Sequence, residues 1–408
     1  MINGVIINIP SEALKLQEKL VQYRHDLHAM PELDLSLPAT SAYVAKALEE
    51  IGITPSLVGG SGLTFTLGNA ATSGKTVLLR ADMDGLPIKE ETGLPYASCN
   101  GNMHACGHDM HTAMLLGAAE LLKAHENKLS GTVKFLFQPG EETMHGAIEA
   151  IREGVLEDPH VDAALMVHVM TGMPLPEGTI VASSTEGIIS ASSDWFDICI
   201  KGKGMHGAIA GSGANPLETV TRIYLSLQEI SKTMLAQGET VVISVGVIQG
   251  GTANNVIPET AVLKGSVRTF SDSARLKAEV MIKECAQQTA QQCGTTAEVT
   301  YIRGCPSAIT DHDLNQQLIN TIIDCYGESS FLDINKLMPG GRLPGSEDFS
   351  FFTREVPCTL AFLAAGCTSD GYIYPIHNPR TAFSDEVLHR GAAIYAGFAL
   401  NWLKSNQL

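Results

Sequence analysis

KTVLLRADMD, at residues 75–84, is an apolar run that ends in acidic residues, and it is the strongest indication of the fold. The same pattern returns in GTVKFLFQPGEE (131–142) and in VDAALMVHV (161–169), which has a histidine near its end. Helical patterns separate these runs, at 111–126 and 146–156. Buried strands that alternate with helices predict an α/β fold, with a mostly parallel sheet flanked by helices on both faces.

Reactive side chains stand at the ends of these predicted strands. Asp84 closes the first run, Glu141 and Glu142 close the second, and His168 lies late in the third. Ligands of open parallel sheets bind beyond the carboxyl ends of the strands. The sequence therefore predicts one functional site at this edge of the sheet.

The pattern changes near residue 185. Strands and helices then follow in the order β-α-β-β-α-β, which is that of a ferredoxin-like α+β unit. We expect a catalytic metal-binding α/β domain from residues 1–184 and 300–408, and an inserted lid or dimerisation domain from residues 185–299. Further elements of the α/β domain are expected at 11–31 (helix, with Ser11 as its N-cap), 38–51 (helix), 311–327 (helix), 359–366 (strand) and 385–404 (helix).

Composition narrows the class of protein. The 408 residues carry a formal net charge of −17, which argues against a nucleic-acid or anionic-membrane partner. Nine cysteines without a CxxC pair indicate a reducing compartment rather than a disulfide framework. The N-terminus has no signal-peptide pattern, and no apolar run approaches the ~20 residues that span a bilayer. We expect a cytoplasmic protein.

The segment HACGHD, residues 104–109, holds the densest cluster of potential metal ligands. Cys106 and His108 are two residues apart just before a predicted helix, and zinc and related ions accept thiolate and imidazole together. The chain has no second close pair for a closed structural site, whereas a catalytic site keeps an open position. Asp109 is expected to orient a ligand imidazole. His104 and His111 receive no role.

A second interpretation makes Cys106 a nucleophile, with His108 or His168 as its base. It leaves the carboxylates at the other strand ends without a function, so a metal site is favoured. Each residue alone has an ordinary explanation, since free cysteines are often core residues and paired glutamates often begin helices. The combination favours a site.

At these residues the chain resembles the amidohydrolase branch of the aminoacylase/glutamate-carboxypeptidase metallopeptidases. That branch includes hippurate hydrolases, N-acyl-amino-acid amidohydrolases and the hydrolases of auxin–amino-acid conjugates. The matching segments run in order across nearly the whole chain: RHDLHAMPEL, RADMDGLPI, HACGHDMHTAMLLGAA, FQPGEE, GKGMHGA, TANNVIPE, GSVRTF, PGSEDFSFF and IHNPR.

The resemblance implies two divalent metal ions per subunit, zinc or manganese, with nickel or cobalt also compatible with the ligands. Cys106 matches the bridging ligand. Glu141 matches the general acid/base, and Asp84 matches the aspartate behind the metals. The other ligands that the resemblance implies are His108, Glu142, His168 and His377.

The resemblance also makes the inserted domain a lid used for association into a homodimer or homotetramer. His206 matches a lid histidine that stabilises the oxyanion, and Asn255 and Arg268 match positions that contact the substrate. The lid stretch GMHGAIAGSGANP lacks a proline that is usual in the family, which weakens any transfer of substrate preference.

The expected function is metal-dependent hydrolysis of the amide bond of a small N-acyl or N-aroyl L-amino acid, which releases a carboxylic acid and an amino acid. A metal-activated water would attack, with Glu141 as general acid/base. A dipeptidase or an N-acetyl diamino acid deacetylase is the alternative on the same site. A catalytically silent ligand-binding protein is disfavoured, because it would have no need for Glu141.

Overall fold

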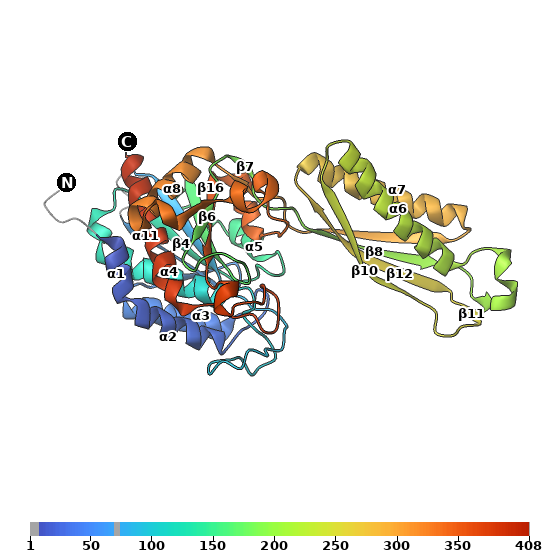
Figure 1. Ribbon diagram of the computed structural model, residues 1–408, viewed down its shortest axis with the longest axis horizontal. Helices are drawn as coiled ribbons and strands as arrows, with labels where there is room; N and C mark the ends of the chain where they lie inside the picture. The colour runs from blue at the N-terminus through green and yellow to red at the C-terminus, as the bar shows by residue number, and fades with distance from the viewer. Residues whose placement is uncertain (1–7, 69–73, 408) are drawn as a thin grey trace. The chain divides into compact units, whose positions relative to one another are not determined.

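The computed structural model describes residues 8–68 and 74–407. Residues 1–7, part of the N-terminal stretch for which no signal peptide is predicted, lie outside the described residues. The chain divides into two compact units (Figure 1). The first comprises Met1–Gly187, Ile309–Arg342 and Asp348–Leu408, and the second comprises Ile188–Ala308 and Leu343–Glu347.

The first unit is built on an eight-stranded sheet in the order β1-β2-β4-β3-β5-β16-β6-β15. Its four central strands, β4, β3, β5 and β16, are parallel, which confirms the predicted α/β class. Every residue of β3 and β4 is buried, as expected for strands covered on both faces. The strands are β1 Ser56–Val58, β2 Gly62–Gly68, β3 Thr76–Asp82, β4 Thr132–Gln138, β5 Ala163–Met170, β6 Ile180–Ala182, β15 Phe331–Asp333 and β16 Cys358–Ala364.

Helices cover this sheet (Figure 1). They are α1 Ile9–Lys15, α2 Gln17–His28, α3 Pro38–Glu50, α4 His108–Ala124, α5 Gly146–Arg152, α8 His312–Tyr326, α9 Ile334–Leu337, α10 Phe352–Glu355 and α11 Leu388–Ser405. Helices α4 and α11 pack against each other and are buried over most of their surfaces. None of the helices in the described ranges combines the length and apolar character that a membrane crossing requires.

The single helix predicted over residues 11–31 is wrong in two respects. Two helices, α1 and α2, meet at Leu16, and the N-cap is Asn8 rather than Ser11. The Asn8 Oδ1 atom accepts a hydrogen bond from the Ser11 backbone amide at 3.1 Å, and Pro10 lies in the first turn. An asparagine oxygen satisfies the amide and proline favours the first turn, so the helix begins earlier than Ser11 indicates.

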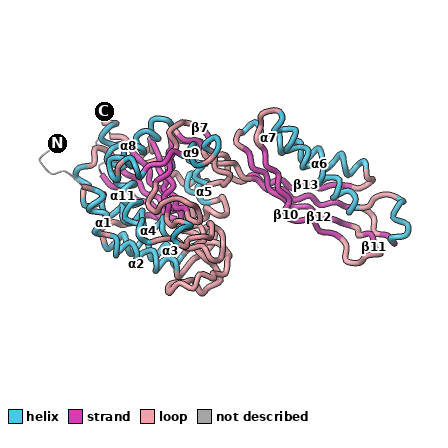
Figure 2. Tube along the Cα trace, viewed as in Figure 1, coloured by secondary structure: helices cyan, strands magenta, loops and turns pink. Residues whose placement is uncertain are grey.

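The second unit has the predicted order of elements. Its four antiparallel strands lie in the order β10-β12-β8-β13, and helices α6 and α7 lie along one side of the sheet (Figures 1 and 2). The boundary predicted between residues 299 and 300 falls inside β13. The elements are β8 Asp194–Lys201, α6 Pro216–Ala236, β10 Val241–Gly250, β12 Thr260–Thr269, α7 Asp272–Gln292 and β13 Thr296–Arg303.

Shorter strands complete the second unit. Strands β9 (Met205–His206) and β11 (Val256–Ile257) pair with each other as a separate two-stranded ribbon. Two-residue strands β7 (Gly187–Ile188) and β14 (Ile309–Thr310) lie where the chain enters and leaves the unit.

Candidate metal and catalytic site

Potential metal ligands gather beyond the carboxyl ends of β3, β4 and β5. Among the groups whose ligand atoms all lie within 4.8 Å of one another are Cys106 with His108 and His168, Cys106 with Glu142 and His377, and His108 with Glu141 and Glu142. Cys106 belongs to two of these groups. A thiolate shared in this way suits a pair of ions, because one group adds two imidazoles to it and the other adds an imidazole and a carboxylate.

A left-handed turn presents Cys106 and His108 together. Gly107, between them, has a φ of 90° and forms the N-cap of α4. A Cβ atom at this position would lie 2.4 Å from Cγ2 of Val169, on β5. Only glycine meets both requirements without strain, so this residue allows the turn to approach β5 and His168 closely.

The ring orientations of two histidines favour metal binding through Nε2. His108 Nδ1 donates to the backbone oxygen of Asp84 at 2.8 Å, and His168 Nδ1 donates to the backbone oxygen of Val169 at 2.6 Å. Among the described residues, the buried Nε2 of His108 has no hydrogen-bond partner. Nε2 of His168 lies 3.6 Å from Sγ of Cys106. Hydrogen bonds at Nδ1 fix the tautomer in which Nε2 is the ligand atom.

Asp84 holds the two glutamates through their backbone. Its Oδ1 accepts from the Glu141 amide at 3.1 Å, and its Oδ2 accepts from the Glu142 amide at 3.0 Å. The carboxylate of Glu141 is buried, and one oxygen accepts from the Asp348 amide at 3.3 Å. Asp84 thus fixes the glutamate turn and, through its own carbonyl, His108. These are the contacts of a positioning residue rather than of a group that meets the substrate.

His377 reaches the cluster from the loop between β16 and α11. Its backbone amide donates to Ala105 at 2.9 Å, and its Nε2 lies 3.3 Å from a Glu142 oxygen. Its φ is 64°, which is unfavourable for a residue with a side chain. Such a conformation persists only when surrounding contacts enforce it, and it is commonest at functional sites.

Burial and neighbouring charges set the protonation of the cluster. Burial and the negative charge of Glu142 raise the pKa of the Cys106 thiol. Burial lowers the pKa of His168 to about 4, whereas contacts with Cys106 and Glu142 raise the pKa of His377 to about 10. A raised thiol pKa disfavours a free nucleophilic thiolate. A bound divalent cation reverses this balance, because a coordinating thiol is deprotonated.

Two side chains that the sequence did not identify fill the gap where β3 and β5 diverge. Paired residues of these strands end at Arg80 and Met166. Beyond them, the Tyr395 hydroxyl donates to the Arg80 backbone oxygen at 2.6 Å and accepts from the Val167 amide at 2.8 Å. His111 donates to Asp82 at 2.6 Å and accepts from the Val169 amide at 2.8 Å. The two strands can therefore separate at the site, because these side chains pair with backbone groups that would otherwise bond across the sheet.

The expectation for Asp109 is wrong. Its carboxylate does not orient a ligand imidazole, because the His108 ring is oriented by the backbone of Asp84. Asp109 Oδ2 instead accepts from Arg24 Nε at 3.1 Å and from His28 Nδ1 at 2.8 Å. The segment RHDLHAMPEL contained this information, since both partners lie in it, but spacing alone does not reveal a contact between α2 and α4.

The three predicted substrate-contacting residues of the second unit do not lie together. His206 is exposed on β9, and the Asn255 backbone oxygen accepts from the amide of Gly207, the residue after it, at 2.8 Å. Arg268 is near the opposite end of β12 from Thr260 and donates to Ser346 Oγ at 2.6 Å. A strand rises about 3.3 Å per residue, so Arg268 lies roughly 25 Å along the sheet from the His206 end.

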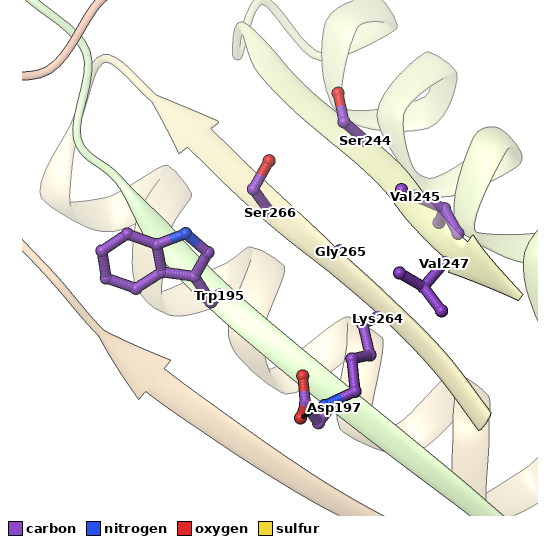
Figure 3. A pocket seen from close by; sticks show the side chains of 9 residues that line it. Trp195, Asp197, Ser244, Val245, Val247, Lys264, Gly265 and Ser266 are labelled. Atoms are coloured by element: carbon purple, nitrogen blue, oxygen red, sulfur yellow. Dashed lines mark hydrogen bonds and ion pairs between the residues drawn. The ribbon is translucent and has the colours of Figure 1, made fainter. Parts of the chain in front are cut away.

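The sheet of the second unit also carries a shallow pocket of about 470 Å³ (Figure 3). Trp195 and the ion pair of Lys264 with Asp197 lie on it, beside Val247 of strand β10 (Figure 3). None of the predicted site residues lines this pocket. It therefore has no place in the chemistry of the metal-ligand cluster.

Comparisons with known proteins identify the family. Residues 78–401 match the model of Peptidase family M20/M25/M40. The chain is 33% identical to the IAA-amino acid hydrolase ILR1-like 2 of Arabidopsis thaliana, over 94% of this chain and 85% of that protein. It is 32% identical to an N-acetylcysteine deacetylase of Bacillus subtilis, over 94% and 96% of the two chains.

A solved structure extends the likeness to the fold. The Bacillus subtilis YXEP protein, described as a dinuclear metal binding peptidase from the M20 family, superposes with a TM-score of 0.78 at 30% identity. The match covers 96% of this chain and 99% of that one. The chain therefore belongs to Peptidase family M20/M25/M40, to its amidohydrolase branch, and is a metallo-hydrolase.

Proposed function

We propose that this enzyme hydrolyses the amide bond of N-acyl or N-aroyl L-amino acids and uses two divalent ions. The observation that carries the proposal is the position of Cys106 in two ligand groups, with the Glu141 carboxylate in a third group that shares His108 and Glu142. The residues that would hold the ions are Cys106, His108, Glu142, His168 and His377. A thiolate, imidazoles and a carboxylate accept zinc, manganese, nickel or cobalt.

The ions, when bound, would polarise the scissile carbonyl and acidify a water. The Glu141 carboxylate would take a proton from the attacking water and deliver it to the nitrogen of the departing amino acid. Its burial and the hydrogen bond from the Asp348 amide hold it in one orientation. Asp84 contributes by fixing the backbone of Glu141.

Residues of the second unit complete the proposal. His206 would donate a hydrogen bond to the developing oxyanion, Asn255 would contact the carbonyl, and Arg268 would bind the carboxylate of the amino acid. A small substrate cannot span the roughly 25 Å between the His206 end of the sheet and Arg268. His206 and Arg268 can contact the same substrate only if they come from two different chains, so we propose that the enzyme acts as a homodimer.

The names of the relatives support this substrate class. An IAA-amino acid hydrolase and an N-acetylcysteine deacetylase both act, by name, on an amino acid whose nitrogen carries an acyl group. The second candidate function is cleavage of dipeptides, because the YXEP protein is described as a peptidase. Both functions use the same groups and differ in what occupies the acyl side.

A substrate panel tests the proposal. The purified enzyme is loaded with zinc, manganese, cobalt or nickel and offered N-acetyl, N-benzoyl and indole-acetyl amino acids beside dipeptides and N-acetyl diamino acids. We expect metal-dependent release of amino acid from the simple N-acyl compounds. Hydrolysis of dipeptides or N-acetyl diamino acids alone would favour the alternative. A protein that binds two ions and hydrolyses none of them would contradict both.

A further inference from the structure

The inner face of α2 carries two basic side chains that belong to none of the ligand groups. Arg24 is fully buried, and His28 is 1% exposed. Buried charges are costly to keep unless every one is paired. Their partners therefore indicate what these residues hold in place.

The first partner is Asp109, which directly follows His108. Arg24 Nε and His28 Nδ1 both donate to Oδ2 of Asp109, at 3.1 and 2.8 Å, and all three side chains are buried. Because Asp109 lies in the first turn of α4, this contact fixes the turn that presents His108 and, just before it, Cys106.

The remaining donors reach the loops on either side of the cluster. Arg24 Nη1 donates to the Phe383 backbone oxygen at 3.0 Å and to the carboxylate of Asp385. His28 Nε2 donates to Glu90 at 3.2 Å, and Glu90 also accepts from the Ser98 amide at 2.7 Å. Arg24 thus reaches the segment that follows His377, and His28 reaches the segment that precedes Cys106.

These two loops also bind each other. The Glu91 amide donates to Pro379 at 2.7 Å, and the His377 amide donates to Ala105 at 2.9 Å. The ring of Phe383 lies 3.2 Å from where a Cβ of Gly107 would be. Arg24 and His28 therefore stand at the centre of an assembly whose outer parts carry Cys106, His108 and His377.

The two basic side chains of this network each lie next to carboxylates. Both ring nitrogens of His28 face carboxylates, so the ring is held as a cation although it is buried. Burial alone would lower the pKa of His28, but Asp109 and Glu90 raise it to about 9. A shift of either loop would separate a buried charge from its partner, which is costly.

We propose that Arg24 and His28 are positioning residues that set the mutual geometry of Cys106, His108 and His377. The inference rests on the proposed metal site and extends it to a pair of residues that touch neither ions nor substrate. Loss of residues that orient metal ligands typically weakens metal affinity 10- to 100-fold. We expect the same loss of metal affinity when Arg24 or His28 is replaced, and we expect it to be largest for the ion that His377 would help to hold.

The test compares Arg24→Lys and His28→Asn with Lys134→Met in the full-length enzyme. Lysine keeps the charge of Arg24 but cannot reach Asp109, Phe383 and Asp385 at once. Lys134 is a matched control, because it is also a buried cation. It lies in the Thr132 half of β4, away from the cluster, and donates to the backbone oxygens of Val155 and Pro159. Each protein is titrated with Co²⁺, and the thiolate-to-cobalt absorption band, the number of ions bound and the thermal midpoint are recorded.

We expect all three variants to lose thermal stability, and only those of Arg24 and His28 to bind an ion 10- to 100-fold more weakly with an altered cobalt band. Wild-type affinity and spectrum in folded Arg24→Lys and His28→Asn would overturn the inference. If those variants do not fold, Asp385→Ala removes one contact of Arg24 at a side chain that is 25% exposed, with the same expectation for the His377 side of the site. Wild-type protein that binds no Co²⁺ would instead overturn the proposed metal site itself.

Discussion

Cys106 is the side chain whose replacement separates the two interpretations of the HACGHD segment. A serine removes the thiolate shared by two ligand groups, so Cys106→Ser should lose at least one of two bound ions and with it most activity. Metal content by mass spectrometry and turnover on the same sample measure both. Cys99→Ser, at an exposed free cysteine, is the control. Full metal content in an inactive Cys106→Ser protein would restore the nucleophile interpretation.

Glu141 should matter for proton transfer rather than for metal binding. Glu141→Gln keeps the shape of the side chain but removes the base, so we expect kcat to fall about 10²- to 10⁴-fold with two ions still bound. Steady-state kinetics over a range of substrate concentrations separates this loss in kcat from a change in KM. A variant that retains wild-type kcat would exclude Glu141 as the general acid/base.

At the level of single residues, the sequence predicted the reactive groups better than their supports. The three strand ends and the resemblance together selected all five proposed ligands, because ligands of open parallel sheets bind beyond the carboxyl ends of the strands. His111 and Asp109 were misjudged for the opposite reason. Their partners, Val169 and Arg24, lie on elements distant in the sequence, and only packing of α4 against β5 and α2 brings them together.

Among the elements, the turn into α4 is the one on which most of the site depends. Gly107→Ala should disturb Cys106 and His108 together, because its Cβ would lie 2.4 Å from Val169 in a left-handed backbone. We expect loss of metal affinity and a lower thermal midpoint. Gly101→Ala is matched, since Gly101 also has a φ of 90° but no atom within 4 Å of the new Cβ. Equal effects of the two changes would mean that backbone strain alone, and not the contact with β5, explains the loss.

Elements with strong patterns were predicted, and short ones were not. The buried runs of β3, β4 and β5 and the helix α4 follow from apolar patterns that any packed sheet requires. Strands β6 and β15 have three residues each, too few to show a period. The break at Leu16 has no sequence signal, because no glycine or proline marks it.

For the whole molecule, three buried neutral histidines predict a pH dependence of stability. Burial lowers the pKa of His104, of His111 and of His168 to about 4. Below the pKa of about 6.5 that a histidine has in the unfolded chain, the unfolded chain binds protons that the folded chain does not. The free energy of unfolding therefore decreases as pH falls towards 4. The loss is about 1.4 kcal/mol per pH unit for each histidine.

Urea unfolding of the metal-free enzyme between pH 4.5 and 6.5 measures this slope. His104→Leu should reduce the slope by about one proton, because the unfolded chain then takes up one proton fewer. His160→Gln serves as the control, since that side chain is 69% exposed. An unchanged slope in His104→Leu would show that His104 is not held neutral in the folded protein.

Titration of the chelator-treated enzyme with Zn²⁺ or Mn²⁺ decides whether two ions on the Cys106-centred cluster drive amide hydrolysis. Bound metal and hydrolysis of an N-acyl amino acid are followed on the same sample. We predict negligible activity without metal and full activity at two ions per chain. In Cys106→Ser, the added metal should restore neither the binding of two ions nor full activity. Hydrolysis that persists in metal-free enzyme, or that reaches its maximum in Cys106→Ser, would be incompatible with this mechanism.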